Sequence, residues 1–180
     1  DGGIKVLLKG SDPISADFVV LSVGVAPETH LAEEAGLQLG MKKSILTDEH
    51  MRTSDENIYA VGDAVCVKNF VSGREALIAL AGPANKQGRI AADNICGISS
   101  SFTGSQGSSV IKLFDMTAAS TGLNEKTAKA ADITYDKVFT FSASHATYYP
   151  GASNMTIKTL FCPDTGRILG AQIVGFEGVD

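Results

Sequence analysis

The fold of this 180-residue chain is decided by residues 53–64, Thr53-Ser54-Asp55-Glu56-Asn57-Ile58-Tyr59-Ala60-Val61-Gly62-Asp63-Ala64. Residues 58–61 predict a buried strand that runs directly into Gly62 and Asp63. Glycine lets the backbone approach a ligand closely, and the Asp63 carboxylate then stands at the strand's carboxyl end, where open α/β sheets bind ligands. A carboxylate there can accept hydrogen bonds from ribose-like hydroxyl groups. The plainer alternative is a strand that ends in an ordinary Gly-Asp turn.

The first half of the chain has the mixture of strands and helices that is typical of α/β domains. The continuous apolar run at residues 17–24 predicts a strand covered on both faces, as in a parallel sheet. Gly82-Pro83 predicts the start of a helix, because proline is favourable in a first turn. Strands are also predicted at residues 4–8 and 44–47, and helices at residues 28–36 and 82–96.

The second half has a different pattern. Residues 99–109 are rich in serine and glycine and predict a linker at a domain boundary. Asp164-Thr165-Gly166-Arg167 predicts a hairpin turn, which makes the strands around it antiparallel. An α+β domain with an antiparallel sheet follows, with strands expected at residues 110–115, 134–142, 155–162 and 168–175 and a short helix at 124–131.

Composition excludes several classes of function. The formal net charge is -5 and no basic cluster is present, which argues against a nucleic-acid partner. No apolar run reaches the roughly 18 residues of a membrane span. Cys66, Cys96 and Cys162 form no C-x-x-C pair and match no common zinc spacing, so no metal site is expected. We expect three reduced, mostly structural cysteines in a cytoplasmic protein.

Residues 53–64 resemble the second flavin-binding motif of the pyridine nucleotide–disulfide oxidoreductases. Leu21-Ser22-Val23-Gly24-Val25-Ala26-Pro27-Glu28 is similar to the stretch where such chains return from the NAD(P) domain to the FAD domain. Two further segments resemble the branch of coenzyme A-disulfide reductases and NADH oxidases. They are Leu80-Ala81-Gly82-Pro83-Ala84-Asn85-Lys86-Gln87-Gly88-Arg89 and His145-Ala146-Thr147-Tyr148-Tyr149-Pro150-Gly151.

This resemblance implies the domain organisation of a C-terminal fragment. It consists of the tail of an NAD(P)-binding domain (1–25), the C-terminal part of a Rossmann-like FAD-binding domain (26–98), a linker (99–109) and a truncated interface, or dimerisation, domain (110–180). A homodimer is the implied assembly.

The resemblance also implies that FAD is the cofactor. Asp63 would bind a ribityl hydroxyl, with Gly62 and Ala64 beside it. The N-terminus of the helix after Gly82 would face the isoalloxazine through Ala81, Gly82, Pro83 and Ala84, since helix N-termini carry unpaired N–H groups and partial positive charge. His145 would approach the flavin. The alternatives are an ordinary proline-capped helix and a surface histidine.

Substrate residues are implied in the same way. Asn85 would face the coenzyme A substrate, and Tyr149 would assist thiol chemistry across the dimer interface, because its hydroxyl can hydrogen-bond a developing thiolate. Tyr148 is the weaker candidate, since adjacent strand residues point to opposite faces. Aromatic packing at a subunit contact is the alternative for both.

The implied parent enzyme accepts hydride from NAD(P)H and passes electrons through a redox-active cysteine to coenzyme A disulfide. None of the three cysteines matches that cysteine, and no G-x-G-x-x-G phosphate-binding loop is present. The chain alone is therefore expected to be inactive. The alternatives are part of an NADH oxidase or peroxidase, or a non-catalytic dimerisation module.

Overall fold

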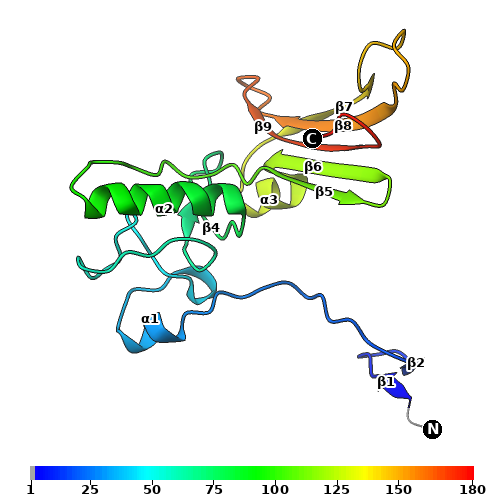
Figure 1. Cartoon of the computed structure of the whole chain (residues 1–180). Coiled ribbons are helices and arrows are strands. Elements are labelled where there is room, and N and C mark those ends of the chain that lie inside the picture. The colour runs from blue at the N-terminus through cyan, green and yellow to red at the C-terminus, as the bar shows by residue number, and fades with distance from the viewer. Residues whose placement is uncertain (1–2) are drawn as a thin grey trace.

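A computed structural model describes residues 3–180. Figure 1 shows a β1–β2 hairpin (Ile4–Val6 and Ile14–Ala16) that lies apart from the rest, an irregular first half around the long helix α2 (Ala81–Ile95), and a sheet in the second half. The first half also contains α1 (His30–Glu34), a 3-10 turn (Met41–Lys43), and the two-residue strands β3 (Val67–Lys68) and β4 (Glu75–Ala76).

The second half is built on one five-stranded antiparallel sheet with the order β5-β6-β9-β8-β7. This confirms the predicted α+β domain and the hairpin at residues 164–167, which joins β8 to β9. The strands are β5 (Ser109–Leu113), β6 (Met116–Gly122), β7 (Asp136–Ala143), β8 (Asn154–Phe161) and β9 (Ile168–Gly175), and α3 (Glu125–Ala130) lies between β6 and β7.

The sheet and α3 share a small apolar core made by Leu123, Ala128, Leu160 and Leu169. The helix begins at a capping box, in which the Asn124 side chain accepts from the Thr127 N–H and the Thr127 hydroxyl accepts from the Asn124 N–H. Such a box pairs two N–H groups that a helix start leaves open. The predicted helix at 124–131 is thereby confirmed.

The core of the first half lies between α2 and the loops that face it. Met51, Val65, Val67, Ala91 and Phe102 form this buried cluster. Phe102 comes from the Ser/Gly-rich segment predicted as a linker. Its N–H donates to the Glu49 carbonyl at 2.7 Å, so this connection is packed against the first half.

Three strands predicted in the first half are not formed among the described residues. Residues 17–24 make no ladder, and Val23 is 93% exposed. Residues 44–47 and 58–61 contribute only isolated bridges, Ile45 to Leu39 and Val65, and Tyr59 to Arg52. A strand exists only where a neighbour accepts and donates its backbone hydrogen bonds over several residues. The described chain supplies no ladder partner for residues 17–24 and only isolated bridges for the other two segments.

The sequence prediction also missed several strands. β2, β3, β4 and β6 were not expected. β6, Met-Thr-Ala-Ala-Ser-Thr-Gly, has small and polar residues, and it becomes a strand because β5 and β9 pair with it on both sides. Tertiary pairing overrides weak local propensity in such a segment.

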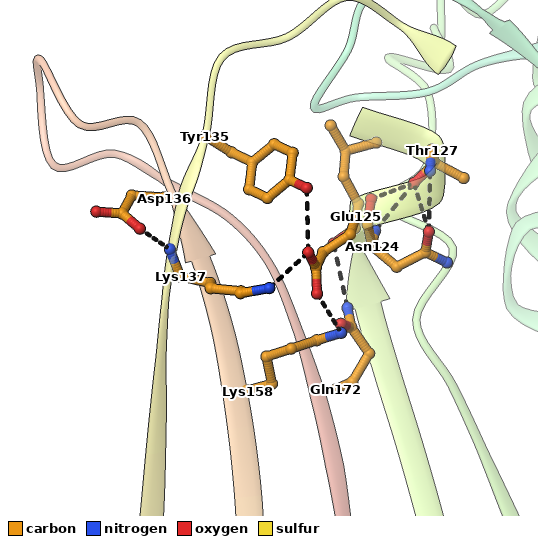
Figure 2. Close-up of polar contacts among 9 residues, drawn as sticks. Asn124, Glu125, Thr127, Tyr135, Asp136, Lys137, Lys158 and Gln172 are labelled. Carbon is orange, nitrogen blue, oxygen red and sulfur yellow. Dashed lines mark hydrogen bonds and ion pairs between the residues drawn. The ribbon is translucent and has the colours of Figure 1, made fainter. Parts of the chain in front are cut away.

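A cluster of charged groups fixes α3 onto the sheet (Figure 2). The Glu125 carboxylate accepts from Lys137 Nζ at 2.8 Å, from the Tyr135 hydroxyl at 3.1 Å and from Lys158 Nζ at 3.4 Å. These contacts, led by the hydrogen bond from Lys137, lower the pKa of Glu125 to about 2. One carboxylate thus joins the first turn of α3 to β7 and β8.

The lowered pKa predicts an acid-dependent contribution to stability. A group whose folded pKa lies below its unfolded value stabilises the fold above the unfolded pKa, and that contribution is lost as pH falls through the folded pKa. Glu125→Gln should therefore lower Tm at pH 7, and its difference from the unmodified chain should shrink between about pH 4.5 and about pH 2. Thermal unfolding followed by circular dichroism measures Tm at pH 7 and the Tm difference at each lower pH. Glu177→Gln, an exposed change, is the control, and a pH-independent difference for Glu125→Gln would contradict the prediction.

Candidate functional site

The predicted ligand-binding turn is held by a buried side chain from α2. Gly62 has φ 87°, a conformation that favours glycine, and its N–H donates to Gln87 Oε1 at 2.7 Å. Gln87 is 1% exposed. A buried amide oxygen that accepts from a backbone N–H fixes the turn against the helix.

The other side of the turn is tied to the segment around Ile45. The Ile45 N–H donates to the Ala64 carbonyl at 2.8 Å, and the Cys66 N–H donates to the Ile45 carbonyl at 2.9 Å. Asp63, between these anchors, is exposed. The structure thus presents the Asp63 carboxylate to solvent on a backbone fixed from both sides.

The start of α2 has the features expected of an anion- or flavin-facing helix end. Leu80 at the N-cap contributes no side-chain cap, and the first turn of α2 contains no acidic residue. A Cβ added at Gly82 would have no atom within 4 Å. The partial positive charge of this end is therefore not neutralised by its own first turn, and there is open space beside it.

These two features fit the flavin end of FAD. Gly62, Asp63 and Ala64 would hold the ribityl chain, and Ala81, Gly82, Pro83 and Ala84 would face the ring. The Gln87–Gly62 hydrogen bond joins the turn to α2, the helix whose start carries the second group. Their individual roles stay predictions.

Asn85 lies exposed on α2. Its Nδ2 donates to the Ala81 carbonyl at 3.2 Å, one turn earlier. This bond keeps the side chain near the helix start, beside the residues predicted to face the flavin. The predicted contact with coenzyme A stays a prediction.

His145, Tyr148 and Tyr149 lie in the loop between β7 and β8, which Figure 1 shows well away from α2. The tyrosines are 82% and 61% exposed. Their ring centroids are 4.8 Å apart, so the expectation that they point to opposite faces of a strand is wrong: they stand in a loop, where the two-residue alternation does not apply. His145 Nδ1 lies 3.2 Å from Ser144 Oγ. A single copy of the chain does not bring these residues to the flavin-facing group.

The cysteines have different surroundings. Cys66 is buried, and burial raises the pKa of its thiol. Cys96 is exposed. At Cys162 the Thr165 hydroxyl, together with backbone N–H groups of the turn, lowers the thiol pKa. In the described part of the chain, no group of three or more His, Cys, Asp or Glu residues could hold a metal ion, and no helix is long and apolar enough to cross a membrane.

Gln87 is the site residue that sequence reasoning missed. The signal in the sequence was the helical spacing: Ala84 lies three residues before Gln87 and Ala91 lies four residues after it, so all three are on the same face of the helix. A polar side chain on a buried face needs a partner, which indicates a specific hydrogen bond.

Two family models match this chain. Residues 1–88 match pyridine nucleotide-disulphide oxidoreductase, and residues 108–180 match the dimerisation domain of the same family. The chain belongs to the pyridine nucleotide-disulphide oxidoreductase family. Its fold is part of the nucleotide-binding domain followed by the dimerisation domain. Members of the family depend on FAD and use NAD(P)H.

Individual relatives place the chain in the branch of coenzyme A disulfide reductases, NADH oxidases and persulfide reductases. It is 37% identical to the NAD(P)H sulfur oxidoreductase (CoA-dependent) of Pyrococcus abyssi over 90% of this chain and 36% of that protein. It is 31% identical to the coenzyme A disulfide reductase of Staphylococcus aureus over 99% of this chain and 40% of that protein. The structure of reduced Bacillus anthracis CoADR-RHD matches with TM-score 0.92 and 48% identity, over 97% of this chain and 31% of that one. The chain thus spans about two fifths or less of these relatives.

Replacement of Gln87 should loosen the predicted ribityl-binding turn. Gln87→Leu keeps roughly the same volume but leaves the half-buried Gly62 N–H without its acceptor, and loss of such a hydrogen bond typically costs about 0.5–1.5 kcal/mol of unfolding free energy. Urea unfolding gives the change. The matched control is Gln38→Leu, since Gln38 is exposed and should change stability by less than about 0.5 kcal/mol. Equal effects of the two variants would contradict an anchoring role.

Proposed function

We propose that this chain is the C-terminal part of a cytoplasmic, FAD-dependent NAD(P)H oxidoreductase that reduces coenzyme A disulfide. The observation that carries the proposal is the Gly62-Asp63 turn, which Gln87 fixes to α2, a helix whose start has no side-chain cap. The coenzyme A dependence named for the Pyrococcus abyssi and Staphylococcus aureus relatives supports this substrate class.

In this proposal the residues of the chain have binding roles. Asp63 accepts a hydrogen bond from the ribityl chain, and the start of α2 stabilises negative charge on the flavin ring. Asn85 orients coenzyme A. When bound, FAD supplies the electron transfer between NAD(P)H and a redox-active cysteine that this sequence does not contain.

Tyr149 would act on a substrate bound to the other subunit. Within one chain the β7–β8 loop is remote from α2, whereas a homodimer can bring the loop of one copy to the site of another. In that arrangement the Tyr149 hydroxyl donates to the sulfur that leaves as a thiolate. Tyr148 packs against its ring, and His145 stands at the start of the same loop.

A second proposal is that the chain by itself is a dimerisation module. A row of side chains that is apolar except for Thr156 crosses the sheet in register, with Ile111, Ala118, Val174, Thr156 and Phe141 from five strands side by side. Ile111, Val174 and Phe141 are exposed, and Phe141 is 76% exposed. A contiguous apolar surface of this kind favours a protein contact. An NADH oxidase or peroxidase, named among the relatives, is the alternative enzyme.

The flavin role of Asp63 can be tested in a chimera in which this chain replaces the matching part of the Bacillus anthracis protein. Asp63→Ala should weaken FAD retention by roughly tenfold or more, because a hydrogen bond to a charged group contributes about 1.5–3 kcal/mol. Flavin absorbance after dialysis measures occupancy. Asp12→Ala, in the exposed β1–β2 turn, is the control. Unchanged FAD occupancy in Asp63→Ala would contradict the assignment. The isolated chain should retain little FAD.

The dimerisation proposal is tested by size-exclusion chromatography with light scattering on the 180-residue chain. We expect a dimer that Phe141→Asp converts to a monomer, because a carboxylate in the apolar row must lose its hydration on association. Thr140→Asp places the same charge on the opposite face of β7 and should leave the dimer intact. A chain that is monomeric at all concentrations would overturn the proposal.

A further inference from the structure

A groove runs along α2 on a face about 100° around the helix axis from Gln87. One wall is the helix from Gly82 to Asp93, and the other is the returning segment 100–108, which Figure 1 shows alongside the helix. Two adjoining pockets, of about 380 and 310 Å³, share Lys86, Phe102 and Gly104 in their linings and form one elongated depression. Gly62, Asp63 and Ala64 do not line either pocket, whereas Gly82 and Pro83, which are predicted to face the flavin ring, line the larger one. The groove is therefore distinct from the predicted ribityl contact and adjoins the predicted ring-facing group.

Two cations line this groove at a spacing of one helical turn. Lys86 and Arg89 are three residues apart on α2, which corresponds to about 5 Å along the axis. Among the described residues neither side chain has an ion-pair partner. Asp93, at the far end, is the acidic residue in the lining. The charge therefore favours an anion next to Lys86 and Arg89, away from Asp93.

The larger pocket of the groove also contains an exposed aromatic ring with hydroxyl groups close to it. Phe70, which is 59% exposed, lines this pocket, whereas Phe102 lines both pockets from the first-half core and is only 9% exposed. Ser105 and Ser108 are next to them. An aromatic surface beside hydroxyl groups suits a planar heterocycle with polar edges.

The wall opposite α2 is built rigidly. The Ser105 N–H donates to the Lys68 carbonyl at 3.0 Å, and the Phe70 N–H donates to the Ser105 carbonyl at 2.9 Å. Gly104 has φ 107°, and a Cβ there would overlap the Lys68 carbonyl. The segment is thus held in its position by backbone hydrogen bonds and by a close approach at position 104 that only glycine allows. A preformed wall of this kind lowers the entropic cost of binding.

We infer that the groove binds an adenosine phosphate, with the purine against the exposed ring of Phe70 and the phosphates on Lys86 and Arg89. Arg89 lines the smaller pocket, Phe70 lines the larger one and Lys86 lines both, so the elongated groove offers cations and an aromatic ring to the two halves of such a ligand. Free ADP, coenzyme A and NADP⁺ all carry this chemistry, and the inference does not depend on the flavin role of Asp63.

The test is isothermal titration calorimetry on the 180-residue chain with ADP, coenzyme A, NADP⁺, adenosine and pyrophosphate as separate probes. ADP should bind saturably, and Lys86→Gln with Arg89→Gln should weaken it at least tenfold, since charge-assisted bonds to phosphate are lost. Lys112→Gln with Lys126→Gln makes the same change of net charge elsewhere and should leave the affinity unchanged. Asp63→Ala should also leave ADP binding unchanged, which separates this site from the predicted ribityl contact.

Phe70→Ala supplies an independent readout, because it should weaken ADP but not pyrophosphate. Tighter binding of coenzyme A than of ADP and NADP⁺ would identify coenzyme A as the source of the adenosine phosphate, and equal binding would identify the ADP group in general. The proposal is overturned if the folded chain, checked by circular dichroism, does not bind ADP. It is equally overturned if pyrophosphate or adenosine alone binds as well as ADP, or if the paired Lys86 and Arg89 change has no effect.

Discussion

The pairing of backbone N–H and C=O groups is the constraint on which both halves of this chain depend, because each unpaired buried group costs free energy comparable to a lost hydrogen bond. In the second half, β6, β8 and β9 each have a partner on both sides, so the central strands are satisfied within the chain. In the first half the apolar run at residues 17–24 has no partner strand among the described residues and stays extended and exposed. The same rule gives an ordered sheet in one place and an open segment in the other.

The two halves are joined by side chains that reach backbone carbonyls across the boundary. Arg74 donates to the Ala130 carbonyl at 3.2 Å, and Arg167 donates to the Val71 carbonyl at 3.1 Å. Val71 also packs against the apolar core of the sheet domain. Guanidinium groups suit this role, since their fixed fork of donors can pair carbonyls that the ends of helices and turns leave open. The contact sets the position of the dimerisation domain relative to the helix that carries the predicted flavin-facing residues.

That helix has different surroundings on its two faces. On one face Gln87 and Ala91 are buried, and Gln87 fixes the Gly62 turn. On the other face Lys86 and Arg89 line a groove closed by residues 100–108. Successive side chains on a helix are 100° apart, so the 15 residues of α2 point in several directions. One helix can therefore contact the Gly62 turn with one face and line the groove with another. The Ser/Gly-rich segment is therefore more than a connection, since it supplies Phe102 to the core and a wall to the groove.

The sequence by itself determined the elements whose pattern is local. The helix at residues 82–96, the short helix at 124–131 and the strands around the 164–167 turn were predictable because glycine, proline and alternating side chains act over a few residues. The order of the two domains and the Gly62-Asp63 motif could likewise be recognised from the sequence. Only the tertiary structure decided that β6 is a strand, that residues 17–24 are not, and that Gln87 anchors Gly62 from 25 residues away. Those outcomes depend on which distant backbone groups come within hydrogen-bond distance, and no local pattern encodes that.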